Sequence, residues 1–230
     1  MPTVRPKIFL AHVIIAAFLC LIFAVAMKAG HVIPAAEYEP DAIGLRPGAG
    51  AVGWRQLDQF SRQIVFVTLI CGMVSFLGTR QRIAAGMDRG GELRGLLTLG
   101  LIFAAVSALT WIVGLAIVKA TGVQLGALAV DSDSPVAALI IQFLSGLGAF
   151  LAGLCITSAI STYGGRGVLY LILLVIATLT VSVIIAIAVS LASGSEADGE
   201  WAANWVALVA GLGFEYSFLR RLFNNLNIAT

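Results

Sequence analysis

Glu215 is the residue whose type and position could most directly do chemistry. It lies inside an otherwise apolar stretch, five and six residues before Arg220 and Arg221. A carboxylate is costly in hydrocarbon, so a charge at such a position is a functional candidate by default. The alternative is an interfacial carboxylate that pairs locally, because only about one to two helical turns separate Glu215 from the charged end of the stretch.

The other residue types with catalytic potential do not form a recognisable constellation. His12 and His31 are the only histidines, and a helix would separate them by about 28 Å, too far for one subunit to present both to one metal or haem. Ser145 and the other serines have no histidine downstream of position 31 that could serve as a base. No aspartate lies inside an apolar stretch, which argues against aspartyl-protease and carboxylate-metal arrangements. The sequence therefore predicts no catalytic residue, no metal ligand and no cofactor.

One nucleotide-binding pattern is present but lacks its context. Residues 48–53 match G-x-G-x-x-G. This motif binds dinucleotides where it follows a strand and opens the helix of a βαβ unit. Here the glycines follow a Pro-rich stretch with no strand before it, so we interpret them as part of a loop.

Six apolar stretches position these residues, and charges bracket each one. They span about 7–30, 61–79, 95–120, 135–162, 167–192 and 201–219. The chain is 60% hydrophobic and 11% charged, with mean hydropathy +1.00, whereas a soluble domain has about 25% charged residues. About 20 helical residues cross a hydrocarbon core of about 30 Å. The sequence predicts an all-α fold: a polytopic transmembrane helical bundle of six spans, forming a single transmembrane domain over 1–230.

Charged residues are sorted by loop, which gives an orientation. Nine of the 14 basic residues fall on the side of the two termini: Arg5, Lys7, Arg80, Arg82, Arg89, Arg94, Arg166, Arg220 and Arg221. By the positive-inside rule, we expect an integral protein of a bacterial inner membrane with both termini in the cytoplasm. The net charge of +2 comes with no clustered basic face of the kind that binds nucleic acid, so no nucleic-acid partner is expected.

The longest connection is an outer loop over 31–60, and its end has helical character. Trp54, Leu57, Phe60 and Ile64 recur at helical spacing among polar residues, which predicts an interfacial helix near 54–60. Tryptophan prefers the headgroup layer, so Trp54, Trp201 and Trp205 are predicted to anchor the chain at the outer surface.

Small residues repeat at every fourth position on two stretches. They are Ser145, Ala149, Gly153 and Thr157 on the fourth stretch, and Ala203, Ala207 and Gly211 on the sixth. Hydrophobic driving force between helices is weak in lipid, so helices associate by close approach along small faces. We expect these faces to build the bundle itself; an interface with a second copy or another subunit is the alternative.

The chain also shows signs of an internal repeat. Residues 95–122 align without gaps on 167–194 with nine matches, and the odd-numbered stretches each precede an acidic outer loop. This pattern suggests three tandem helical hairpins in the same orientation, an arrangement found in some transporters.

Three hypotheses about function follow. The first is a non-catalytic membrane subunit that assembles with a larger complex or with itself, and it is favoured by short loops, small-residue faces and the lack of chemistry. The second is a small channel or facilitator for a neutral or weakly charged solute, supported by the repeat and by polar residues on the fourth and fifth stretches. The third, a membrane-embedded enzyme, ranks last because no nucleophile has a base. The expected partners are the lipid bilayer and other membrane subunits or a second copy.

Overall fold

The computed structural model describes residues 4–28, 52–121, 135–194 and 196–225, and every regular element within these ranges is an α-helix. The helices are α1 (Val4–Lys28), α2 (Val52–Ser75), α3 (Thr79–Ala84), α4 (Arg89–Ala120), α5 (Pro135–Tyr163), α6 (Gly165–Ser193) and α7 (Glu196–Asn225). The predicted all-helical fold is confirmed for these residues. Much of the predicted outer loop, residues 31–51, lies outside the described residues.

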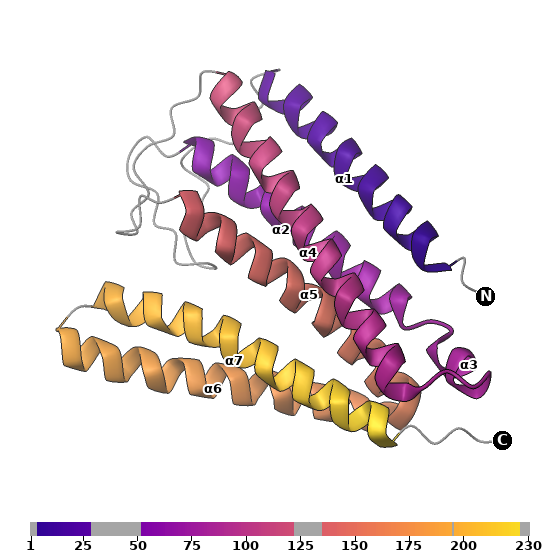
Figure 1. The fold of residues 1–230 in the computed structure, drawn as a ribbon. Helices are drawn as coiled ribbons and strands as arrows, with labels where there is room; N and C mark the ends of the chain where they lie inside the picture. The colour runs from indigo at the N-terminus through magenta and orange to yellow at the C-terminus, as the bar shows by residue number, and fades with distance from the viewer. Residues whose placement is uncertain (1–3, 29–51, 122–134, 195, 226–230) are drawn as a thin grey trace.

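The long helices alternate in direction, and α4 and α5 lie at the centre. In Figure 1, α1, α2, α4 and α5 lie side by side, and the α6–α7 hairpin meets them at one end and diverges from them at the other. The beginning of α1, the short helix α3 and the end of α7 lie together at the lower right of that view. We call this the α3 end of the bundle.

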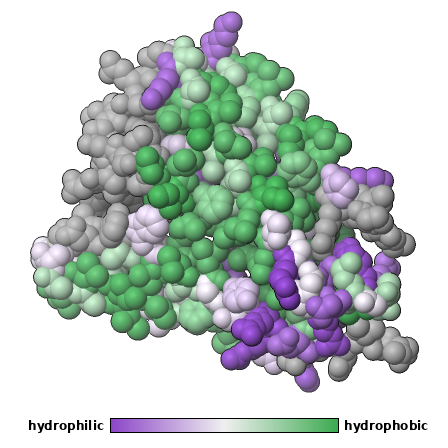
Figure 2. Space-filling view, viewed as in Figure 1, coloured by the Kyte–Doolittle hydropathy of each residue, from purple (hydrophilic) through white to green (hydrophobic). Residues whose placement is uncertain are grey.

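Five segments in the described part of the chain are long and apolar enough to cross a membrane. They are Pro6–Lys28, Gln59–Ala84, Arg89–Ala120, Ala138–Tyr163 and Gly165–Ser193. Hydrophobic residues cover most of the face seen in Figure 2, and hydrophilic residues gather where Figure 1 places the α3 end. The fold is therefore compatible with a membrane helical bundle. The sixth predicted span, 201–219, falls in α7, which is not among these five, and remains a prediction.

The predicted helix near 54–60 and the second predicted span form one helix, which ends earlier than expected. Residues 54–60 form the first turns of α2 and continue without a break into the apolar segment. The helix then ends at Ser75, before the expected residue 79, because Gly78 adopts a left-handed conformation with φ of 79°. Only glycine takes this conformation readily. The chain turns there and continues as α3.

The helices α4 and α7 are longer than the apolar stretches that predicted them. The Asp88 carboxylate accepts a hydrogen bond of 2.8 Å from the Gly91 backbone and caps α4, which begins at Arg89 instead of residue 95. α7 covers Glu196–Asn225, where 201–219 was expected. A hydropathy pattern marks only the apolar part of a helix, so charged turns at its ends escape it.

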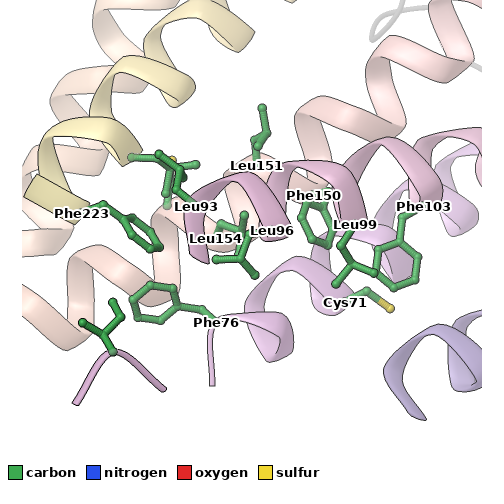
Figure 3. Packing of buried hydrophobic residues seen from close by; sticks show 13 residues of the cluster. Cys71, Phe76, Leu93, Leu96, Leu99, Phe103, Phe150, Leu151, Leu154 and Phe223 are labelled. Atoms are coloured by element: carbon green, nitrogen blue, oxygen red, sulfur yellow. The ribbon is translucent and has the colours of Figure 1, made fainter. Parts of the chain in front are cut away.

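The buried core consists of two apolar clusters at different heights along the bundle. The first joins α2, α3, α4, α5 and α7 near the α3 end, and Figure 3 shows Phe76, Leu96, Phe103, Phe150 and Phe223 within it. The second joins α1, α2 and α4 further away and contains Phe23, Met27, Leu57, Phe60, Ile64, Trp111 and Val118. Together these clusters hold four of the long helices to α4.

The two stretches of the predicted repeat lie in different surroundings. Phe103 on α4 is fully buried, whereas Val175, its counterpart on α6, is exposed. Leu96 is likewise buried and its counterpart Val168 exposed. The three tandem hairpins remain a prediction.

Candidate functional site

A layer of buried polar side chains separates the two apolar clusters. His12 of α1, Thr68 of α2 and Ser107 of α4 are almost completely buried. The Thr68 hydroxyl donates to the Ile64 carbonyl at 2.9 Å, and its oxygen lies 3.2 Å from His12 Nε2 and 2.9 Å from Ser107 Oγ. A hydroxyl has one proton and two lone pairs, so Ser107 Oγ and His12 Nε2 both donate to Thr68.

This hydrogen bonding places a proton on His12 Nε2. With the proton on Nε2, the His12 Nδ1 of a neutral ring is an acceptor, and it has no hydrogen-bond partner among the described residues. The ring packs edge-to-face with Phe103, with centroids 4.6 Å apart. These contacts therefore hold α1, α2 and α4 together through buried hydrogen bonds.

A second polar contact lies further along the same seam. Ser61 of α2 donates to the Gln142 side chain of α5. On α5, Gly146 follows Gln142 by one turn, and a Cβ at Gly146 would lie 3.1 Å from that of Ser107. Ser61 and Thr68 are seven residues apart and so share one face of α2. Polar groups thus line the seam between α2, α4 and α5 at two levels.

A buried ion pair holds the α3 elbow. Glu92 of α4 is fully buried, and its Oε1 accepts from Arg82 Nη2 at 2.6 Å and from Arg82 Nε at 2.9 Å. The Thr79 hydroxyl also contacts both, lying 3.2 Å from Glu92 Oε1 and 3.0 Å from Arg82 Nη2. This cluster fixes α3 against the first turn of α4.

Two further arginines at the α3 end bond to carbonyls near helix C-termini. Arg80 donates to the carbonyl of Ser161 near the end of α5, and Arg89 donates to that of Asn224 in α7 at 2.9 Å. The last carbonyls of a helix have no partner inside it, and a cation also favours the negative end of the helix dipole. These two arginines therefore stabilise the ends of α5 and α7.

The predicted small-residue face of α5 meets α2 at Gly153. A Cβ on Gly153 would lie 2.2 Å from the Leu69 carbonyl oxygen, and one on Gly72 would lie 2.2 Å from that of Phe150. The two backbones therefore touch here. Ala149 is also buried, while Ser145 and Thr157 are half-buried.

The predicted face of α7 is less closely packed. A Cβ on Gly211 would lie 3.8 Å from Thr178 Cγ2 of α6, an ordinary contact distance. Ala203 and Ala207 are half-buried. A methyl group would therefore fit at Gly211, whereas it would not fit at Gly153 on α5.

Glu215 lies on α7, and α5 is its neighbour. The Cys155 thiol donates to the Glu215 backbone carbonyl, with sulfur and oxygen 3.6 Å apart. No ion pair joins its carboxylate to Arg220 or Arg221, whose side chains are exposed, and Glu215 Oε2 is buried with no hydrogen bond to any described residue. The structure thus does not form the local pair that the sequence suggested as the alternative.

The remaining candidates are only partly described. Trp205 is half-buried on α7, and the side chains of Trp54 and Trp201 lie outside what the structure describes. Among the described residues, no group of three or more His, Cys, Asp or Glu could hold a metal ion.

Sequence reasoning missed the two polar clusters. From sequence alone, His12 is a candidate only as a metal or haem ligand, and Glu92 is not a candidate. A signal existed for Glu92, because a carboxylate at the start of a helix, ten residues after an arginine, can pair across a turn. No such signal existed for Thr68 and Ser107.

No protein family model, curated protein or solved structure matches this chain.

Proposed function

We propose that the chain is a non-catalytic integral membrane subunit that assembles with a larger membrane complex or with copies of itself. The exposure of α6 is the observation that supports this best. Of the α6 residues whose burial is described, only Gly167 and Ser182 are buried, and twelve large apolar side chains of this helix are exposed. A helix held mainly through α7 and the end of α5 presents most of its circumference to lipid or to another membrane helix.

The polar clusters support the same proposal. His12, Thr68 and Ser107 bond to one another across three helices, and Arg82 and Glu92 bond across the α3 elbow. Groups used in this way stabilise the bundle and need no further role. We also propose a bacterial inner membrane with both termini in the cytoplasm, since the predicted cytoplasmic arginines that are described lie at the α3 end.

Native mass spectrometry after purification in mild detergent is expected to give a defined oligomer or a stoichiometric complex. A bulky apolar substitution on the exposed face of α6 should disrupt this assembly while leaving membrane insertion intact. Leu179→Trp on α6 is the test, because Leu179 is 58% exposed. We expect the assembled fraction to fall at least about tenfold, which corresponds to about 1.4 kcal/mol.

A matched control exists on α1. Leu21 is 60% exposed, so Leu21→Trp makes the same chemical change on a different outward face. It should leave assembly unchanged. A wild-type chain that is a clean monomer under the same conditions would refute the proposal.

A channel or facilitator for a neutral or weakly charged solute is the second candidate. The polar seam between α2, α4 and α5 favours it, because polar groups at two levels could exchange hydrogen bonds with a passing solute. In this case Thr68→Val should abolish solute flux into liposomes in the fraction of the protein that keeps its helix content and native mass. Flux that survives this substitution, or its absence in the wild type, would exclude this candidate.

A further inference from the structure

The α3 end carries more positive charge than the fold uses. Arg80, Arg82 and Arg89 bond to other parts of the chain. Lys7, Arg94, Arg166, Arg220 and Arg221 have exposed side chains. Among the described acidic residues there, Asp88 caps α4, Glu92 is buried against Arg82, and Glu215 is partly buried. The exposed surface of this end is therefore strongly basic.

Three of the exposed arginines lie at one level of the α6–α7 hairpin. The two helices are antiparallel, and a Cβ on Gly211 of α7 would lie 3.8 Å from Thr178 of α6. Nine residues onward along α7 is Arg220, and nine residues back along α6 is Leu169. Because both helices rise 1.5 Å per residue, Arg220 and Arg221 lie within about one helical turn of the height of Arg166 along the hairpin axis.

The face of α6 that carries Arg166 changes character along its length. Tyr170 follows Arg166 by four residues and Leu173 follows it by seven, so the three share one face. Tyr170 is exposed and forms an edge-to-face pair with exposed Tyr163 of α5, with centroids 5.4 Å apart. Beyond it, Leu173 and Ile176 are exposed. Along this face, the cation lies where a lipid headgroup would be, the aromatic ring lies at the level of the interface, and the aliphatic side chains lie at the level of the acyl chains.

We infer that this end of the hairpin binds an anionic phospholipid. Arg166 contacts the headgroup, Arg220 and Arg221 add positive charge at the same height, and one acyl chain lies along the Tyr170 and Leu173 face. A glycerophospholipid fits because the site combines a cationic end with a long exposed apolar surface, whereas free phosphate would use only the cations. The inference does not depend on the proposed function.

Native mass spectrometry with a mixture of phosphatidylglycerol and phosphatidylcholine of identical acyl chains tests the site. The wild type should retain phosphatidylglycerol selectively. Each arginine removed should weaken binding about fivefold, so Arg166→Gln with Arg220→Gln should reduce bound phosphatidylglycerol at least about tenfold. The matched control is Lys28→Gln with Lys119→Gln. It removes two exposed charges from the last turns of α1 and α4, at the end of the bundle away from the α3 end, and should leave the amount of bound phosphatidylglycerol unchanged.

A charge-conserving variant separates binding from folding. Arg166→Lys with Arg220→Lys should retain the lipid, because the positive charge remains. Equal retention by the arginine-to-glutamine variant and the wild type would overturn the inference. The inference would also be overturned if the Lys28→Gln, Lys119→Gln control lost as much bound lipid, or if the charge-conserving variant lost the lipid. Full displacement of the lipid by inorganic phosphate would overturn it too.

Discussion

Replacing Gly153 by alanine is expected to lower the free energy of unfolding by about 3 kcal/mol, because the added methyl group would overpack the contact between α2 and α5. Its Cβ would lie 2.2 Å from the Leu69 carbonyl oxygen and 2.8 Å from the Met73 amide nitrogen. Both atoms belong to a backbone, so the helices must separate to admit it. Equilibrium unfolding in mixed micelles measures the loss.

Gly148 provides the control on the same helix. A Cβ there would meet only Leu212 Cδ2, at 3.7 Å. Gly148→Ala should therefore be neutral or raise stability by up to about 1 kcal/mol through its helix propensity. Gly72→Ala, made on the opposite helix, should resemble Gly153→Ala. If all three variants had the same stability, α2 and α5 would not be in close contact.

The second large effect is expected at the α3 elbow. Arg82→Met should cost about 3 kcal/mol, because it removes the positive charge that contacts the fully buried Glu92 carboxylate at 2.6 Å. Glu92→Gln should cost less, since the Arg82 side chain is 15% exposed and can turn toward water. Unfolding in mixed micelles again measures both.

A double variant tests whether the charges act as a pair. Arg82→Met combined with Glu92→Leu removes both charges and keeps apolar volume, so it should recover most of the stability lost in Arg82→Met. Arg94→Met, which removes an exposed arginine from the same end of α4, should have little effect. Additive losses in the double variant would show that Arg82 and Glu92 act independently.

Hydropathy predicted the helices well because composition alone marks an apolar segment. The helix ends were harder to predict, since Gly78 and Asp88 act through backbone conformation and a single capping bond. The helix expected near 54–60 and the span expected from residue 61 form one continuous helix in the structure. Polar residues such as Arg62 and Gln63 lie on the exposed side of α2 and do not interrupt it.

Contacts between helices were the part that sequence could not supply. The stripe containing Gly153 predicted close packing, yet nothing in it indicated that α2 and Gly72 would be the partner. Likewise, His12, Thr68 and Ser107 are separated by 56 and 39 residues along the chain, and they meet only because α1, α2 and α4 are neighbours. Periodicity describes one helix at a time and is silent about its neighbours.

The single residue between α5 and α6 couples the positions of the two helices. Tyr163 ends one apolar helix, Gly165 begins the next, and Gly164 alone turns the backbone with φ of 57°. With no further residue between the two helices, a change of backbone angle at Gly164 swings α6 directly against α5. Only glycine takes a positive φ readily, so a substitution at this one residue is expected to displace both helices at once.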